Sequence, residues 1–197
     1  MRTFITAIFL LALSPVFAQK SYTDSLLSYQ LKYKTELTTI IQNDTAFVRF
    51  YPVNEKYRVT AKVEILAGQA FFPMATSGTG PKDAIKFAKL SFTLQGKLYT
   101  LYAYRLAQLM GHSEYRDNFF IPFTDSLSGI ESYGGGKYID FKTGDISAEK
   151  TLVIDFNHSY NPYCAFVTGY NCPIPPKEND LVVAVYAGEK AYGKGKH

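Results

Sequence analysis

The 197-residue sequence has no tryptophan, only three methionines and two cysteines, and charged residues make up just 19% of it. Low charge together with 47% hydrophobic residues excludes an intrinsically disordered chain and predicts a packed core. The formal net charge is +4, but the lysines form no run longer than two, so the sequence lacks the basic stripe of a nucleic-acid-binding protein. Internal repeats and linkers are also absent, and the length fits one domain.

Aromatic residues are abundant, and 16 tyrosines with 15 phenylalanines favour half-buried, pleated surfaces. The clearest strand is 57–66, where apolar and polar residues alternate with a period of two. The pair Gln95-Gly96 predicts a hairpin turn between strands at 85–94 and 97–106. Further strands are expected at 46–51, 70–76, 119–123, 137–141, 151–156 and 181–187. Nine short strands predict a mainly β fold, an antiparallel barrel or tight sandwich with one N-terminal helix, because a flat sheet of that width would expose long edges.

The first 18 residues have the pattern of a secretory signal peptide. Arg2 precedes an apolar run over 4–13, which is followed by a helix-breaking Ser14-Pro15 and a small-x-small cleavage site ending at Ala18. The run is about half of the roughly 20 residues needed to span a bilayer, which disfavours a membrane anchor. We therefore expect cleavage after Ala18, no transmembrane segment in the mature chain, and a periplasmic or secreted location.

The remaining chain divides into an N-terminal helix, 19–45, and a β domain, 46–197. Apolar residues of the helix fall on one side between 22 and 42, namely Leu26, Leu27, Tyr33, Leu37, Ile40 and Ile41. Ser21 or Thr23 can cap its start, and Asn43-Asp44 ends it.

The two cysteines, Cys164 and Cys172, are separated by seven residues. In an exported protein the default expectation is a disulfide, which would stabilise the fold by about 2.5 kcal/mol through loop closure. A metal site with His158 is an alternative, but three ligands at this spacing match no standard zinc pattern. A catalytic thiolate is disfavoured by the nearby second cysteine. We expect a disulfide and neither a metal nor another cofactor.

The densest polar cluster without periodicity is 155–180, which contains four prolines and both cysteines and so predicts a rigid, irregular excursion. A long irregular segment inside a compact domain is typical of a functional loop. A second cluster, 124–137, includes three consecutive glycines that permit close backbone approach. The candidate site residues of the two clusters are Glu131, Tyr133, Asp155, Asn157, His158, Tyr160, Asn161, Glu178 and Asn179.

Structural roles compete with binding at these positions. Asp155 and Asn157 follow a predicted strand and can cap turns, and the tyrosines can be half-buried packing residues. Glu131 with Asp155 or Glu178 can supply a carboxylate pair for acid–base hydrolysis if they converge. No serine lies in a G-x-S-x-G motif, and 78–82 lacks the spacing of a phosphate-binding loop.

Several strings resemble the bacterial family of domains of unknown function numbered 1684. They are F-Y-P-V-N-E-K-Y-R-V-T-A (50–61), F-T-D-S-L-S-G-I-E-S-Y-G-G-G-K-Y-I-D (123–140), D-F-N-H-S-Y-N-P-Y-C-A-F (155–166), C-P-I-P-P-K-E-N (172–179) and A-G-E-K (187–190). His158 stands where arginine is usual in that family. Many members carry another region first, whereas here a signal peptide and one helix precede the similar part. The resemblance implies no established reaction.

Three functions fit these observations. The first is an exported, non-catalytic binding module whose rigid loop contacts a small molecule, a glycan or an envelope protein. The second is a hydrolase that uses Glu131, Asp155, His158 or Glu178. The third is a structural accessory domain of the cell envelope. Convergence of these side chains in a pocket would favour an enzyme. Hydrogen bonds between these side chains and the backbone amides of the loops would instead favour the structural role.

Overall fold

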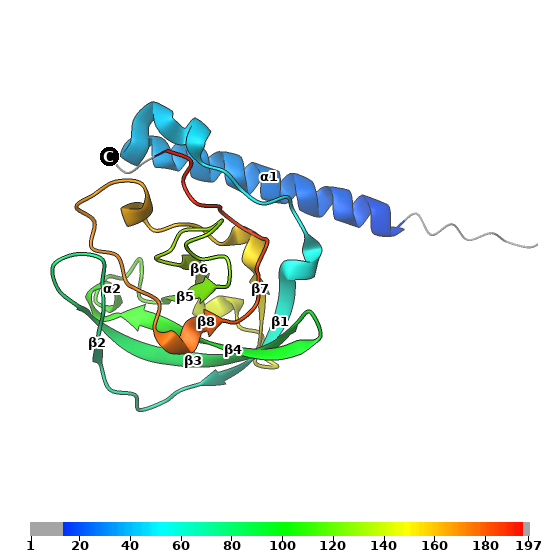
Figure 1. Ribbon diagram of the computed structural model, residues 1–197. Helices are drawn as coiled ribbons and strands as arrows, with labels where there is room; N and C mark the ends of the chain where they lie inside the picture. Colours follow the sequence, from blue (N-terminus) through cyan, green and yellow to red (C-terminus); the bar gives the residue numbers. More distant parts are fainter. Residues whose placement is uncertain (1–13, 195–197) are drawn as a thin grey trace, which may run out of the picture.

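The computed structural model describes residues 14–194, with side chains described from residue 21 onward (Figure 1). Residues 1–13 of the predicted signal peptide lie outside the described residues. Within the described part of the chain, no helix is both long and apolar enough to cross a membrane.

The fold is mainly β, an eight-stranded and largely antiparallel sheet curled into a half-barrel (Figure 1). Its main path runs β6-β5-β4-β3-β1-β7, while β2 pairs with β3 and the short β8 pairs in parallel with β5. The strands are β1 (Arg58–Ile65), β2 (Phe72–Met74), β3 (Lys82–Leu94), β4 (Lys97–Leu106), β5 (Asn118–Asp125), β6 (Lys137–Lys142), β7 (Thr151–Asp155) and β8 (Asp180–Leu181).

The predicted hairpin is confirmed as β3 and β4, whose register runs from Ala84 opposite Leu106 to Leu94 opposite Lys97. Gln95 and Gly96 both have positive φ, 51° and 77°, as a two-residue turn between twisted strands requires. Inward-facing residues of this hairpin and of β1 form the main core, which includes Ala61, Leu90 and Leu101.

Two predicted strands are wrong. Residues 46–51 begin inside the 3₁₀ helix η1 (Gln42–Phe47) and make only a single bridge, from Phe50 to Glu189. Of 181–187, only Leu181 belongs to a strand. Beyond Leu181 the alternating apolar side chains still enter the core, but the backbone carbonyls accept hydrogen bonds from Ser126 and from the Lys137 ammonium instead of a neighbouring strand.

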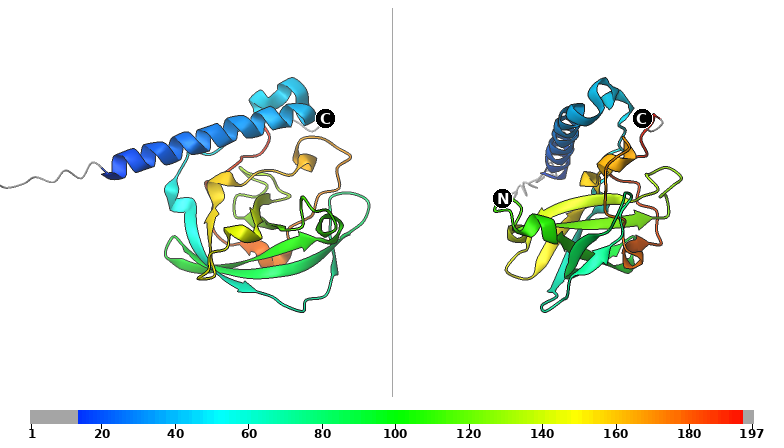
Figure 2. Two further views of the ribbon diagram at one scale, coloured as in Figure 1. Left: turned by 180° about the vertical axis from the view of Figure 1, so that it is seen from behind. Right: turned by 90° about the vertical axis from the view of Figure 1, so that its left-hand side faces the viewer.

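The N-terminal helix α1 (Ser14–Ile41) begins five residues before the predicted boundary at residue 19 and therefore includes the predicted cleavage site at Ala18. Figures 1 and 2 show α1 on the side of the molecule opposite the β3–β4 hairpin, with irregular C-terminal segments between them. Its side chains Leu26, Leu37 and Ile41 are buried. The other helical segments are short: α2 (Ala107–Met110), η2 (Glu55–Tyr57), η3 (Thr143–Asp145), η4 (Phe156–His158), η5 (Tyr163–Ala165) and η6 (Lys177–Asn179).

The predicted disulfide is not formed. Cys164 and Cys172 are buried thiols that approach to 3.2 Å, whereas a disulfide bond is about 2.05 Å long. Non-covalent contacts hold the loop instead, because the backbone N–H of Cys164 donates to the Cys172 sulfur and the Cys172 backbone exchanges hydrogen bonds with Ser77. The two cysteines are neighbours, as a disulfide requires, but they form no covalent bond.

Candidate functional site

The segment that follows β7 is built on the Asp155 and Asn157 side chains. Oδ1 of Asp155 accepts a 3.0 Å hydrogen bond from the backbone N–H of Asn157 and so caps η4. The buried Asn157 amide accepts from the Asn54 backbone N–H at 3.0 Å and donates to the Asn54 carbonyl at 2.9 Å. Both residues therefore have the turn-forming role that competed with binding in the sequence analysis.

Three tyrosines of α1, spaced by seven and four residues, donate hydrogen bonds to the β domain. They are Tyr22 to Asp155 Oδ2 (2.7 Å), Tyr29 to the carbonyl of His158 (3.0 Å) and Tyr33 to Glu189 Oε2 (2.9 Å). Burial is the main cause that raises the pKa of all three hydroxyls. The polar segment predicted to bind a ligand thus binds the chain's own N-terminal helix.

Glu189 is the most deeply buried carboxyl of this contact, with 0% exposure. Its Oε2 also accepts from the Asn161 backbone N–H at 2.8 Å, while its Oε1 has no hydrogen-bond partner among the described residues. Burial raises its pKa to about 8. Gly188 makes this position possible, because it has a φ of 73° and a Cβ there would collide with Ser159.

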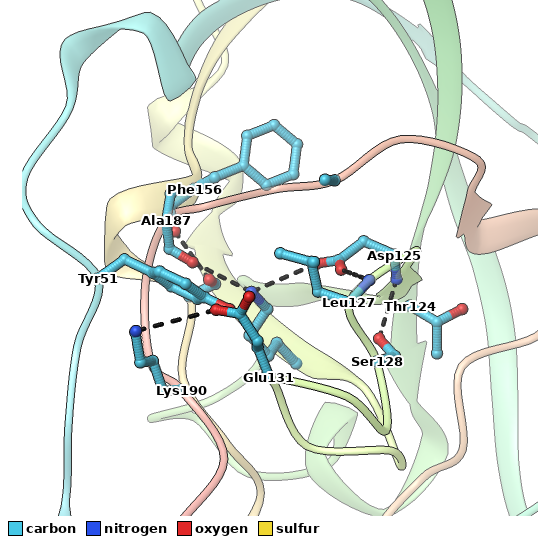
Figure 3. Close-up of polar contacts among 12 residues, drawn as sticks. Tyr51, Thr124, Asp125, Leu127, Ser128, Glu131, Phe156, Ala187 and Lys190 are labelled. Carbon is cyan, nitrogen blue, oxygen red and sulfur yellow. Dashed lines mark hydrogen bonds and ion pairs between the residues drawn. The ribbon is translucent and has the colours of Figure 1, made fainter.

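A second buried titratable side chain, Lys137, lies at the start of β6. Figure 3 labels its two partners, Asp125 and Ala187. Lys137, 1% exposed, donates to the Ala187 carbonyl at 3.0 Å and pairs with Asp125 at 3.4 Å. Burial lowers the pKa of Lys137 and raises that of Asp125, although each charge stabilises the ionised form of the other group. The sequence analysis missed Lys137, yet the period of two along β6 places it on the same face as the buried Ile139.

A cleft of about 970 Å³ lies between α1 and the strands β6 and β7, which form the two edges of the curled sheet. Its walls are rich in rings, namely Tyr29, Tyr33, Tyr138, Phe141, Tyr160 and Tyr163. Its charged lining has more acidic than basic groups, namely Glu36, Asp140, Asp145 and Asp155 against Arg58, with His158 beside them. The cleft is therefore acidic although the whole chain carries a net charge of +4.

Two hydrogen-bonded pairs organise the polar wall of the cleft. The Tyr160 hydroxyl donates to Asp140 Oδ2 at 2.6 Å, and His158 Nδ1 lies 3.2 Å from Asp155 Oδ2. Asp140 is accessible to solvent, but desolvation by the surrounding cleft walls raises its pKa despite the Tyr160 hydroxyl, which favours the carboxylate. Burial would also raise the pKa of Asp155, but hydrogen bonds from His158, Asn157 and Tyr22 outweigh it and lower the pKa.

The structure brings together only part of the predicted site. Asp155, His158 and Tyr160 line the cleft, whereas Asn157 and Asn161 are buried in the structure around it.

Outside the cleft, Tyr133 contacts the Cys164 sulfur at 3.6 Å, and Glu131 pairs with Lys190 and Tyr51. Asn161 donates its side-chain amide to the Lys190 carbonyl.

The two predicted residues of η6 lie elsewhere again. The Glu178 carboxylate accepts from Lys86 at 2.6 Å and from the Tyr104 hydroxyl at 2.8 Å, and these two partners outweigh the effect of burial and lower its pKa. The Asn179 side chain bonds both the N–H and the carbonyl of Tyr102 and also the carbonyl of Pro122. Asn179 thus replaces a strand residue between β4 and β5, which pair directly only at Tyr104 and Phe120.

A metal site of His158 with the two cysteines was the alternative to a disulfide. Between residues 14 and 194 no three His, Cys, Asp or Glu side chains cluster closely enough to hold a metal ion.

The sheet, the docked helix and the cleft together define a mainly β fold with a helix-covered cleft. The family described as "Protein of unknown function (DUF1684)" matches residues 44–190, and the chain belongs to this family. The match confirms the family predicted from the sequence, and α1 precedes the matched residues.

Among solved structures, the chain is similar to an uncharacterized protein of Haloarcula marismortui determined by solution NMR. The two are 26% identical, the alignment covers 88% of this chain and 96% of the other, and the TM-score is 0.66. No curated protein matches the chain.

Proposed function

We propose that this chain is an exported, non-catalytic binding domain that holds a small organic cation in the cleft beneath α1. The observation that carries the proposal is the combination of ring-lined walls with four carboxylates against one arginine. Aromatic faces attract organic cations through their quadrupoles, by about 0.5–2 kcal/mol for each good contact. An acidic cleft with low-dielectric walls further concentrates cations.

The arrangement gives less support to hydrolysis. Glu131 and Glu178 are absent from the lining of the cleft and have lysine partners of their own. The remaining pair, Asp155 and His158, is engaged in holding α1, because Tyr22 donates to Asp155 and Tyr29 donates to the carbonyl of His158. A binding role needs only the walls of the cleft and does not require these groups to transfer protons.

Export is the second part of the proposal, and the sequence of residues 1–18 supports it. Cleavage after Ala18 would start the mature chain at Gln19 and leave Tyr22 and the rest of the helix contact intact. Mass spectrometry of protein from a periplasmic or secreted fraction should find Gln19 at the N-terminus. Protein that starts at Met1 and remains in the cytoplasmic fraction would overturn this part.

Calorimetric titration with tetramethylammonium chloride tests the binding role, with sodium chloride at equal ionic strength as the reference. We expect saturable binding that weakens about tenfold in Asp140→Asn, since one carboxylate then no longer attracts the cation. Asp83→Asn is the matched control, because Asp83 is an exposed carboxylate on β3 outside the cleft lining.

Two results would contradict the cation proposal. Binding of neutral disaccharides such as cellobiose without any binding of tetramethylammonium would assign the cleft to a glycan instead. Equal weakening by Asp140→Asn and Asp83→Asn would show that net charge, and not the cleft, attracts the cation.

A further inference from the structure

A second, smaller cavity of about 260 Å³ adjoins the cleft. The two cavities share three lining residues, Tyr138, Asp140 and Tyr160, so a single wall separates them. The hydrogen bond between Tyr160 and Asp140 is part of that wall. A ligand that occupies both cavities must therefore pass these three residues.

The smaller cavity differs chemically from the cleft. Most of its remaining lining is apolar, namely Leu106, Leu109, Met110, Phe119, Phe120 and Pro173. Asp140 is its only carboxylate, and it belongs to the shared wall. This cavity therefore suits an aliphatic or aromatic group, whereas the cleft suits a cation.

Two polar residues of the smaller cavity have unmet hydrogen-bonding capacity. Nε of Arg105 and Oδ1 of Asn118 are buried and have no hydrogen-bond partner among the described residues. The Arg105 guanidinium packs over the Phe87 ring at 4.4 Å, and burial lowers its pKa. A buried donor and a buried acceptor without partners are costly. Rotation of the two side chains toward the cavity would let a bound group with one hydrogen-bond acceptor and one donor satisfy them.

We infer that the ligand is an elongated molecule with a cationic head in the cleft, an apolar chain that passes Tyr160 and Asp140, and a hydrogen-bonding group at its far end near Arg105 and Asn118. This inference rests on the proposed function, because the cation site fixes one end of the ligand. It adds the length, the polarity and the direction of the bound molecule.

Three probes separate the parts of this inference: tetramethylammonium, hexyltrimethylammonium and (6-hydroxyhexyl)trimethylammonium. Each buried methylene should tighten binding about fourfold, so the five methylenes that hexyl adds could tighten it by up to about 1000-fold over tetramethylammonium. We expect a gain of at least about 50-fold, which corresponds to about three fully buried methylenes. The terminal hydroxyl should add a further factor of about five, because it can bond the unpartnered atoms.

Two variants and one matched control show where the alkyl chain of the probe binds. In Leu109→Trp the larger side chain should fill the small cavity, so the hexyl probe and tetramethylammonium should bind that variant equally. Leu98→Trp introduces the same side chain at a position that is 76% exposed in the β3–β4 hairpin, and it should retain the hexyl preference. Arg105→Met should remove only the advantage of the hydroxyl.

The outcomes distinguish this inference from the proposed function. If tetramethylammonium fails to bind, the cation site itself is wrong and both proposals fail. If tetramethylammonium binds but the hexyl probe gains nothing, the elongated ligand is overturned while the cation site stands. A hexyl preference that survives in Leu109→Trp as fully as in Leu98→Trp would also overturn it, because the chain would then lie elsewhere.

Discussion

The hydroxyl of Tyr33 donates a 2.9 Å hydrogen bond to Oε2 of Glu189, which lies 156 residues later in the sequence and is fully buried. This contact joins a helix outside the family match to a carboxyl within it. The same helix supplies Tyr29, Tyr33 and Glu36 to the cleft. The docking of α1 therefore forms one wall of the proposed binding site.

Glu189→Gln should flatten the pH dependence of stability. Burial raises the pKa of Glu189 to about 8 in the folded state, so the folded state retains its proton while an unfolded carboxyl, with a pKa near 4.5, has lost it. The stabilising contribution is complete below about pH 4.5 and is lost as the pH rises to 8, by about 1.4 kcal/mol per pH unit. Glutamine does not titrate, so this slope should disappear from urea unfolding measured between pH 5 and 8.

The matched control is Glu131→Gln, which replaces an exposed carboxyl paired with Lys190. It should retain the wild-type slope. If Glu189→Gln keeps the same slope as Glu131→Gln, then Glu189 is not a neutral buried acid near pH 7.

Tyr22→Phe should weaken the attachment of α1. The variant removes the 2.7 Å hydrogen bond to Asp155, and a hydrogen bond to a charged acceptor contributes about 1.5–3 kcal/mol. We expect a loss of about 1–2 kcal/mol in the free energy of unfolding and faster amide exchange along α1. Tyr115→Phe is the control, because Tyr115 is 38% exposed and lies outside α1. Unchanged amide exchange along α1 in Tyr22→Phe would show that the tyrosines do not hold the helix.

Much of the fold could be predicted from the sequence because side-chain periodicity is local. The alternation along β1, the Gln95-Gly96 turn and the apolar face of α1 are each readable within about ten residues. The irregular region at 46–51 was misread as a strand, because its apolar residues pack in the core while its backbone follows a 3₁₀ turn and then a single bridge. Hydrophobicity indicates burial there but cannot distinguish the two backbones.

Sequence patterns identified part of the cleft lining, but not which side chains converge on it. Residues around Asp155 line the cleft. Asn179, a predicted binding residue, instead uses its side chain for hydrogen bonds to the backbone of Tyr102 and Pro122. Asp140, which holds Tyr160, was not a candidate, because an acidic residue on the outer face of a predicted strand is indistinguishable from ordinary surface charge. Such convergence depends on contacts distant in sequence, which no local pattern encodes.

Asn179→Ala tests the structural reading of Asn179. The substitution would leave the N–H and carbonyl of Tyr102 and the carbonyl of Pro122 without these partners in a buried position, and each such group costs about 1–3 kcal/mol. We expect a loss of at least about 3 kcal/mol by chemical denaturation. Asn171→Ala, which removes bonds to the exposed loop at Gly78 and Gly80, should cost less than about 1 kcal/mol. Equal losses in both variants would contradict the bridging role.

Lys137→Met should destabilise the protein by about 3–5 kcal/mol, because it leaves Asp125 buried without its counter-charge. The double variant Lys137→Met with Asp125→Asn should recover part of that loss, since the asparagine oxygen can still accept from the Leu127 backbone N–H as Asp125 does at 2.7 Å. Thermal and urea unfolding of the four proteins form a double-mutant cycle. Strictly additive losses would show that the two charges do not stabilise each other.

Cation binding in the cleft should weaken in acid. Desolvation by the cleft walls raises the pKa of Asp140 above its usual value near 3.8, and only the ionised form attracts a cation. The affinity for tetramethylammonium should therefore be constant above the pKa of Asp140 and fall as the pH decreases through it, by up to about tenfold. Asp140→Asn should bind weakly at every pH and lose this part of the pH dependence, as measured by titration calorimetry between pH 4 and 8. A wild-type affinity that stays constant over that range, while Asp140→Asn still binds more weakly, would show that the carboxylate titrates below pH 4 and that desolvation does not control its charge.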